Sequence, residues 1–114
     1  MSDQNIHHKG LTVEKWSKFS LVEQMANIGS EVERAVKWRE KNKEYYYLAL
    51  ERALELIDLT LADPKNKGRL KEVARMREVL VDYFYYDNIY GSTPERWRKY
   101  FFGFNYAAAL AKGR

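Results

Sequence analysis

The chain has 114 residues and a formal net charge of +4; 46% of its residues are hydrophobic and 32% are charged. This length and balance favour one folded domain and argue against intrinsic disorder. Cysteine is absent, which excludes disulfides, thiol nucleophiles and thiolate metal sites and is compatible with the cytoplasmic location that we expect. Because no window holds the roughly 18 consecutive apolar residues of a membrane span, we expect no membrane partner.

Residues 1–19 are predicted to form an N-terminal arm that is partly disordered or contains one short helical turn. This turn, around residues 12–18, would be anchored by Trp16 and Phe19. The pair His7-His8 could bind a metal weakly, but it is better interpreted as part of a solvated terminal segment.

Residues 20–39 are predicted to form the first long helix. Ser20 and Glu23 fit a capping box, in which each side chain satisfies a backbone N–H at the start of the helix. Apolar or small side chains then recur at steps of four and three, the spacing of one helical face. These residues are Leu21, Met25, Ile28, Val32 and Ala35.

Residues 44–62 are predicted to form the second helix, whose apolar side chains cover more than half of its circumference. Such a helix is usually buried by several neighbours. Glu51, Glu55 and Asp58 share one narrow strip. We interpret the strip as a partner for Lys or Arg on a later helix or on another subunit, and a site for a hard cation is the alternative.

The third helix is predicted over residues 69–86, after the break at Asp63-Pro64, because proline disfavours the helical conformation in the preceding residue. Its apolar stripe is Leu70, Val73, Arg77 or Met76, Leu80 and Phe84. The fourth helix is predicted over residues 94–112, with Ser92 or Thr93 as its cap and Pro94 at its first position. Its stripe is Trp97, Phe101, Phe104, Ala108 and Ala111.

Four helices joined by short connections predict an all-α fold, an antiparallel four-helix bundle over residues 20–112. No alternating apolar and polar pattern long enough for a strand competes with this prediction.

The sequence does not point to an enzyme. The short length and the charged, aromatic composition resemble the helical HEPN ribonucleases, but their late Arg–His catalytic motif is absent because no histidine follows His8. A di-metal carboxylate site would need histidines three residues after glutamates, and no such pair occurs. Phosphate-cradling and dinucleotide-binding glycine motifs are absent as well, so no cofactor is expected.

Basic residues gather where the third and fourth helices begin. The net charge is −3 over residues 43–63 but +3 over residues 64–86 and +3 again over residues 87–114. Cations at a helix start work against the helix dipole, so this arrangement suits an external anion such as phosphate. The candidate nucleic-acid-binding residues are Lys65, Lys67, Arg69, Lys71, Arg75, Arg77, Arg96, Arg98 and Lys99. The alternative is a solvated basic face balanced by the acidic second helix.

Aromatic residues make up 15% of the chain, and several are consecutive, so that they cannot all face one core. Exposed aromatic side chains favour a partner interface, and we expect self-association as a homo-oligomer. The candidate interface residues are Tyr45, Tyr46, Tyr47, Tyr85, Tyr86, Trp97 and Tyr100. The alternative is that these rings pack against loops at the ends of the bundle.

The four helices between Ser20 and Lys112, the basic second half and the aromatic surface resemble a group of small bundle proteins. These are the accessory variability determinant proteins of diversity-generating retroelements and the four-helix proteins encoded in intervening sequences of ribosomal RNA genes. The resemblance implies a ring-forming bundle that binds a reverse transcriptase and its template RNA. It further implies contacts to RNA or to the polymerase from Arg69, Lys71, Arg75, Arg77, Arg96 and Arg98.

Two hypotheses follow. In the first, the chain is a non-enzymatic, self-associating bundle that binds RNA or a nucleic-acid-bound protein through its third and fourth helices. In the second, it is a structural or adaptor bundle whose partner is purely protein. Binding of the first kind weakens steeply as salt rises, because phosphate contacts release counterions.

Overall fold

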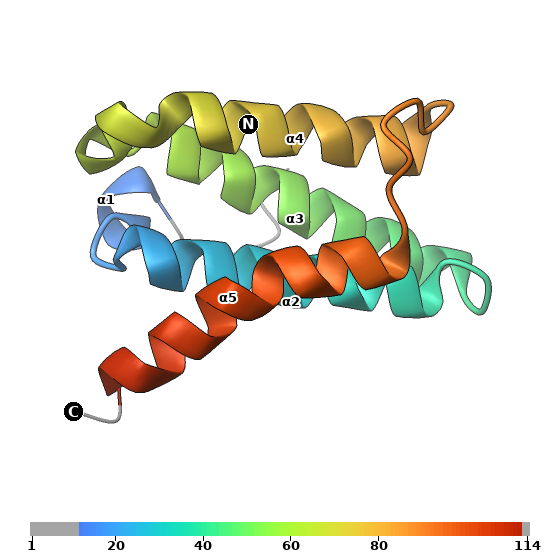
Figure 1. Ribbon diagram of the computed structural model, residues 1–114, viewed down its shortest axis with the longest axis horizontal. Helices are drawn as coiled ribbons and strands as arrows, with labels where there is room; N and C mark the ends of the chain where they lie inside the picture. Colours follow the sequence, from blue (N-terminus) through green and yellow to red (C-terminus); the bar gives the residue numbers. More distant parts are fainter. Residues whose placement is uncertain (1–11, 113–114) are drawn as a thin grey trace.

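The computed structural model describes residues 12–112, and every regular element in this range is a helix (Figure 1). The elements are α1 (Val13–Trp16), α2 (Leu21–Trp38), α3 (Lys43–Ala62), the 3₁₀ helix η2 (Pro64–Arg69), α4 (Leu70–Tyr85) and α5 (Pro94–Lys112). The prediction of an all-helical chain with four long helices is therefore confirmed. Predictions made for residues 1–11, including His7-His8, lie outside the described range.

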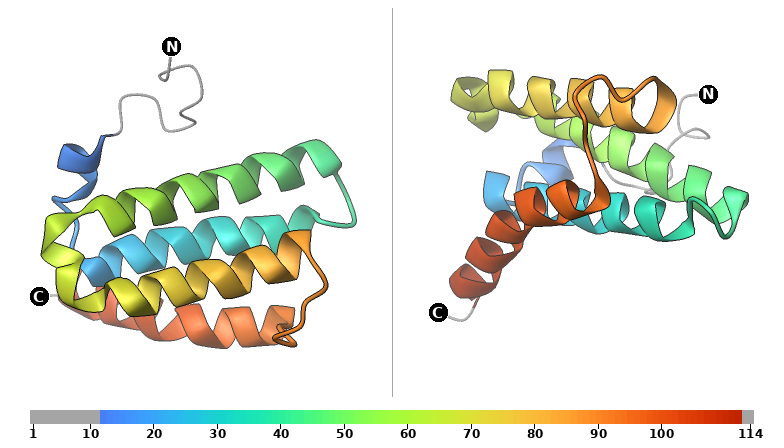
Figure 2. Two further views of the ribbon diagram at one scale, coloured as in Figure 1. Left: turned by 90° about the horizontal axis from the view of Figure 1, so that it is seen from above. Right: turned by 45° about the vertical axis from the view of Figure 1, so that its right-hand side comes forward.

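Successive long helices run in opposite directions (Figures 1 and 2). Helix α2 packs against both α3 and α5, and α3 packs against α4 as well as α2. The helices therefore pack in the order α4, α3, α2 and α5, and this row folds round so that α4 and α5 face each other. Helix α5 crosses α2 at an angle, so its C-terminal half points away from the other helices (Figure 2).

The helix starts follow the predicted local chemistry. Ser20 and Glu23 form the full capping box: the Ser20 N–H donates to the Glu23 carboxylate over 3.0 Å, and the Glu23 N–H donates to Ser20 Oγ over 3.1 Å. At α5 the cap is Thr93, whose hydroxyl accepts the Arg96 N–H over 3.1 Å, with Pro94 in the first helical position. Both arrangements satisfy donors that a helix start leaves without partners.

The core consists of most residues of the predicted stripes. In α5, Trp97, Phe101 and Ala108 are buried, but Phe104 is half-buried and Ala111 is exposed. Four of the five stripe residues of α2 are buried. In α4 the buried stripe is Val73, Met76, Leu80 and Phe84. Met76 therefore takes the core position that the sequence left open between Met76 and Arg77. Each fully buried aliphatic side chain contributes about 1.5–3 kcal/mol through the hydrophobic effect.

Helix α3 is buried by several neighbours, as its wide apolar arc predicted. It contacts α1, α2, α4 and η2. Its buried residues are Tyr46, Ala49, Leu50, Ala53, Leu56, Ile57 and Thr60. The outward strip begins with Glu51 and includes Asp58, which pairs with Arg77 on α4.

The approach of α5 to α2 depends on Gly29. A Cβ atom placed on Gly29 would lie only 2.7 Å from Cγ and 2.8 Å from Cβ of Phe101. Phe101 is 3% exposed and fills the space that a side chain would take. Because the clash would involve the root of the ring and not a flexible tip, the two helices need glycine here.

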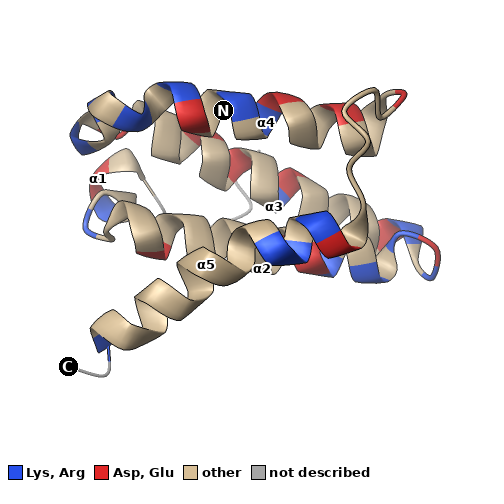
Figure 3. Ribbon diagram, viewed as in Figure 1, with Lys and Arg blue, Asp and Glu red and all other residues tan. Residues whose placement is uncertain are grey.

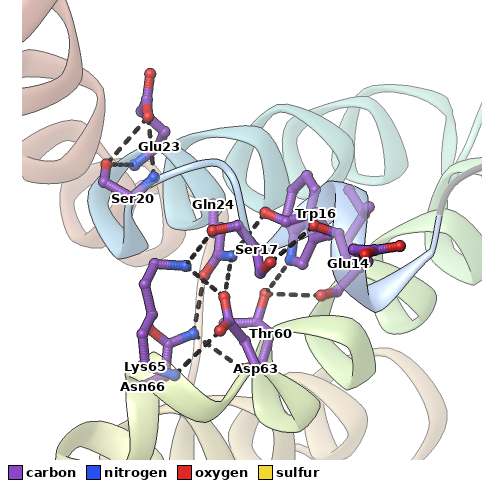
Figure 4. Close-up of polar contacts among 11 residues, drawn as sticks. Glu14, Trp16, Ser17, Ser20, Glu23, Gln24, Thr60, Asp63, Lys65 and Asn66 are labelled. Carbon is purple, nitrogen blue, oxygen red and sulfur yellow. Dashed lines mark hydrogen bonds and ion pairs between the residues drawn. The ribbon is translucent and has the colours of Figure 1, made fainter.

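A buried polar network joins α1, α2, α3 and η2 at one end of the molecule (Figure 4). Gln24 Nε2 donates to the Trp16 carbonyl over 3.0 Å and to the Asp63 carboxylate over 2.8 Å. Asn66 Nδ2 donates to Gln24 Oε1 over 2.9 Å, and Trp16 Nε1 donates to Thr60 Oγ1 over 2.9 Å. All of these side chains are buried. The hydrogen bonds of the network therefore offset the free-energy cost of burying its polar groups. They also fix α1 against the end of α3.

Asp63 is the ionised member of this network. Burial alone would raise its pKa, but hydrogen bonds from Lys65 and Gln24 outweigh burial and lower the pKa below the ordinary value of 3.8. Lys65 Nζ also donates to the Ser17 carbonyl over 3.0 Å. The lysine thereby holds the N-terminal turn to the start of η2.

We predict opposite effects for two glycine-to-alanine substitutions. Gly29→Ala should lower the free energy of unfolding, because overpacking costs about 1–3 kcal/mol and exceeds the gain in helix propensity of about 1 kcal/mol. Gly103→Ala in α5 should raise the free energy of unfolding by roughly 0.5–1 kcal/mol, because a Cβ atom at this position meets no atom within 4 Å. Thermal denaturation followed by circular dichroism measures both. A Gly29→Ala protein as stable as the Gly103→Ala protein would contradict the close approach.

Asp63 should contribute to stability in a pH-dependent way. Because its folded-state pKa is depressed, its contribution is complete above the unfolded-state value near 4 and is lost as the pH falls through the lower folded-state pKa. Asp63→Asn should cost about 1–3 kcal/mol at neutral pH, since a donor would face the Gln24 and Lys65 donors. It should also flatten the loss of stability as the pH falls below about 4.

Urea denaturation at a series of pH values tests this prediction, with Asp87→Asn as the control because Asp87 is an exposed carboxylate in the loop after α4. An equal acid dependence in the wild type and the Asp63→Asn protein would rule out the role given to Asp63.

Candidate functional site

A cleft of about 400 Å³ separates α4 from α5. Its lining from α4 is Glu72, Arg75, Met76 and Val79, and its lining from the loop and α5 is Tyr90, Ser92, Arg96, Trp97 and Tyr100. The cleft therefore combines apolar walls, aromatic rings and two arginines from helices that are distant in sequence. Pockets of a few hundred Å³ with apolar walls and few polar groups are typical of ligand sites.

The α4–α5 loop places Tyr90 at the cleft. The Asp82 carboxylate accepts the N–H of Ile89 over 3.0 Å and the N–H of Tyr90 over 3.2 Å. Asn88, with φ +54°, and Ser92 bond each other twice, over 2.9 and 2.8 Å. These hydrogen bonds give the backbone N–H and C=O groups of the loop partners close in sequence. Tyr90 is therefore held in a defined position.

Tyr90 and Arg75 form a preorganised pair. The Arg75 guanidinium carbon lies 5.2 Å from the centre of the Tyr90 ring, within the range of a cation–π contact. The Tyr90 hydroxyl donates to the Glu78 carboxylate over 2.5 Å, and this bond raises the pKa of Tyr90. Arg75 is exposed, so its outer N–H groups can reach a ligand at the mouth of the cleft.

Tyr100 and Trp97 form the α5 side of the cleft. Burial, with a smaller contribution from the negative charge of Glu72, raises the pKa of Tyr100 to about 12. Tyr100 therefore remains a neutral phenol at physiological pH and can donate a hydrogen bond. Trp97 is 6% exposed, and its indole N–H has no hydrogen-bond partner among the described residues.

The structure divides the nine basic candidates into two groups. Four of them pair with carboxylates: Lys65 with Asp63, Arg69 with Glu72, Arg77 with Asp58 over 2.9 Å, and Arg98 with Glu33 over 2.9 Å. The other five have no carboxylate partner in the range 12–112; they are Lys67, Lys71, Arg75, Arg96 and Lys99.

Of these nine candidates, the cleft brings together only Arg75 and Arg96. Figure 3 shows the basic residues along the first half of α4 and the first turns of α5, with acidic residues interspersed. The basic surface is therefore narrower than the sequence predicted, because Asp58 and Glu33 neutralise Arg77 and Arg98 from neighbouring helices.

The aromatic candidates also divide. Tyr46 and Trp97 are buried, at 7% and 6% exposure, and belong to the core of this chain. Tyr46 lies beside Arg39 and Phe84. The four exposed candidates are Tyr45, Tyr47, Tyr85 and Tyr86. Three further exposed side chains were not among the predicted interface residues: Phe102, Tyr106 and Leu110. The absence of charge from residues 100–111 was a signal that could have identified them.

The acidic strip of α3 is not arranged as a metal centre. Asp58 is occupied by Arg77. Among the described residues, no group of three or more histidine or carboxylate side chains is placed to hold a metal ion. The same range of the chain contains no helix that combines the length and the apolar character needed to cross a bilayer.

Comparison with protein-family models, with curated proteins and with solved structures gave no match. The resemblance to retroelement accessory proteins therefore stays a prediction.

Proposed function

We propose that the chain is a non-enzymatic, self-associating four-helix bundle that binds single-stranded RNA, alone or held by a nucleic-acid-processing protein, through the α4–α5 cleft. The observation that supports this proposal is the meeting of Arg75 and Arg96 with Tyr90 and Tyr100 around one cleft. Cations that bind phosphate and rings that stack with bases are the two components of sequence-tolerant recognition of single strands.

The binding mechanism is positional. Arg75 and Arg96 stand on opposite walls and would contact successive phosphates, while the ring of Tyr90 or Tyr100 would stack with an unpaired base. Lys71 lies one turn before Arg75, and Lys99 lies one turn after Arg96. These exposed lysines would extend the electrostatic attraction along the strand beyond the cleft.

A purely protein-binding adaptor is the second candidate function. It is favoured by the pairing of four basic candidates with carboxylates and by the exposure of Tyr45, Tyr47, Tyr85 and Tyr86. Exposed tyrosines are common in protein interfaces. Under this alternative, charge reversal in the cleft would not affect partner binding.

We predict that Arg75→Glu combined with Arg96→Glu lowers RNA affinity by roughly a hundredfold or more, because two charged contacts are lost and each costs roughly 1.5–3 kcal/mol. Fluorescence anisotropy with labelled oligouridine of about 20 nucleotides measures the affinity, and titrations at about 50 and 200 mM KCl give its salt dependence. The salt slope should fall by about 1 for each phosphate contact removed.

The control is Arg77→Glu combined with Arg98→Glu, which makes the same charge change on the same two helices outside the cleft. This control should retain most of the affinity of the wild type. Equal losses in both double variants would show nonspecific attraction, and no binding by the wild type at low salt would favour the adaptor alternative.

A further inference from the structure

The second half of α5 is an uncharged helix that lies largely outside the core. Residues 100–111 contain no Asp, Glu, Lys or Arg, as the continuous tan segment of α5 in Figure 3 shows. Phe102, Tyr106 and Leu110 are 65%, 58% and 49% exposed. Their spacing of four places them on one face of the helix.

This exposed face is distinct from the face that holds α5 on α2. Phe101 and Ala108 are buried, whereas Phe102 and Tyr106 stack with each other, with ring centres 6.1 Å apart and planes inclined by 16°. The stacked rings form a continuous apolar ridge. Exposing large apolar side chains side by side is unfavourable in water and marks interaction surfaces.

A groove of about 520 Å³ lies beside this ridge, between α2 and α5. Gly29 and Phe101 are among the residues that line it, and Phe102 and Asn105 line it from the same side as the ridge. Charged side chains line it as well; they are Glu33, Arg34, Lys37 and Arg98. The ridge is therefore the apolar part of this surface, and polar or charged residues make up much of the lining of the groove beside it.

We infer that this face of α5 binds the same face of a second copy of the chain in an antiparallel, two-fold pair. A two-fold interface brings identical patches together, so that the ridges of the two copies can pack against each other. The absence of charge over residues 100–111 means that two identical faces do not repel each other. It also leaves a polyanion or a charged peptide without complementary charges on the ridge itself.

The exposed area is appropriate for a weak dimer. A fully exposed aromatic side chain presents about 200 Å², so the three ridge residues supply roughly 350 Å² per copy. A standard interface buries about 800 Å² per partner. The ridge therefore provides somewhat less than half of a standard interface, and Gly103, Asn105 and Ala109 add exposed area between the large side chains. An interface of this size lies at the low end of the range, where weak and transient contacts are found.

This inference rests on the self-association included in the proposed function, but it uses a surface separate from the RNA-binding cleft and from the tyrosines chosen from the sequence. Tyr106→Glu places a charge in the centre of the paired ridges and should shift the protein to monomer. The matched control is Tyr86→Glu, because Tyr86 is 73% exposed and belongs to the interface predicted from the sequence.

Sedimentation velocity from about 1 to 200 µM, a range suited to micromolar affinity, measures the oligomeric state of each protein. We expect a concentration-dependent dimer for the wild type and for Tyr86→Glu, and a monomer for Tyr106→Glu. Circular dichroism confirms that each variant keeps its helix content. Since the chain has no cysteine, Tyr106→Cys gives a second test: oxidation should link it into dimers faster than it links Tyr86→Cys.

Two results would overturn the inference in distinguishable ways. A wild-type monomer at the highest concentration removes self-association altogether, whether another segment of the chain or a different protein covers the ridge. A dimer that survives Tyr106→Glu, or that dissociates with Tyr86→Glu instead, keeps self-association but moves it to another surface. Neither result affects the anisotropy test of RNA binding.

Discussion

The close packing of α5 on α2 determines what the rest of the molecule presents to its surroundings. Phe101 occupies the space left by the missing side chain of Gly29, which brings the first half of α5 against α2. Because α4 packs on α3 and α5 packs on α2, the two outer helices face each other across a cleft. The angle between α5 and α2 then carries the second half of α5 beyond the core. The cleft and the exposed ridge are thus two consequences of one contact.

Two polar arrangements stabilise the ends of this framework. The network of Gln24, Asp63 and Asn66 joins the short N-terminal helix to the α3–α4 connection. At the other end, Asp82 accepts backbone donors of the α4–α5 loop and so positions Tyr90. Each carboxylate is buried and satisfied by hydrogen bonds, which makes a buried charge tolerable and specifies one local conformation. The cleft residues are consequently held by α4, by α5 and by a loop that hydrogen bonds keep in one conformation.

The sequence predicted the helices and their faces well because these depend on local periodicity and capping. It could not predict which basic residues share a surface, because this depends on how each helix is rotated. Once Met76 turns into the core, Arg75 and Arg77 point to different sides, one toward the cleft and the other toward Asp58. Tyr46 is buried for a similar reason, since neighbouring residues on a helix differ by about 100° in direction and one of three consecutive tyrosines faced the core. The exposed ridge on α5 was not predicted, because the neighbouring stripe that begins with Trp97 and Phe101 already explained how the helix packs on the bundle. A second apolar face was therefore not expected.

The contact between Gly29 and Phe101 can be observed directly by nuclear magnetic resonance. A nuclear Overhauser effect between the Gly29 Hα protons and the Phe101 ring protons, together with a ring-current shift of the glycine resonances, is the result that this account predicts. If Gly29 showed no such effect and its Hα resonances lay at their usual positions, α5 would not rest on α2 in this way, and both the cleft and the ridge would lose their structural basis.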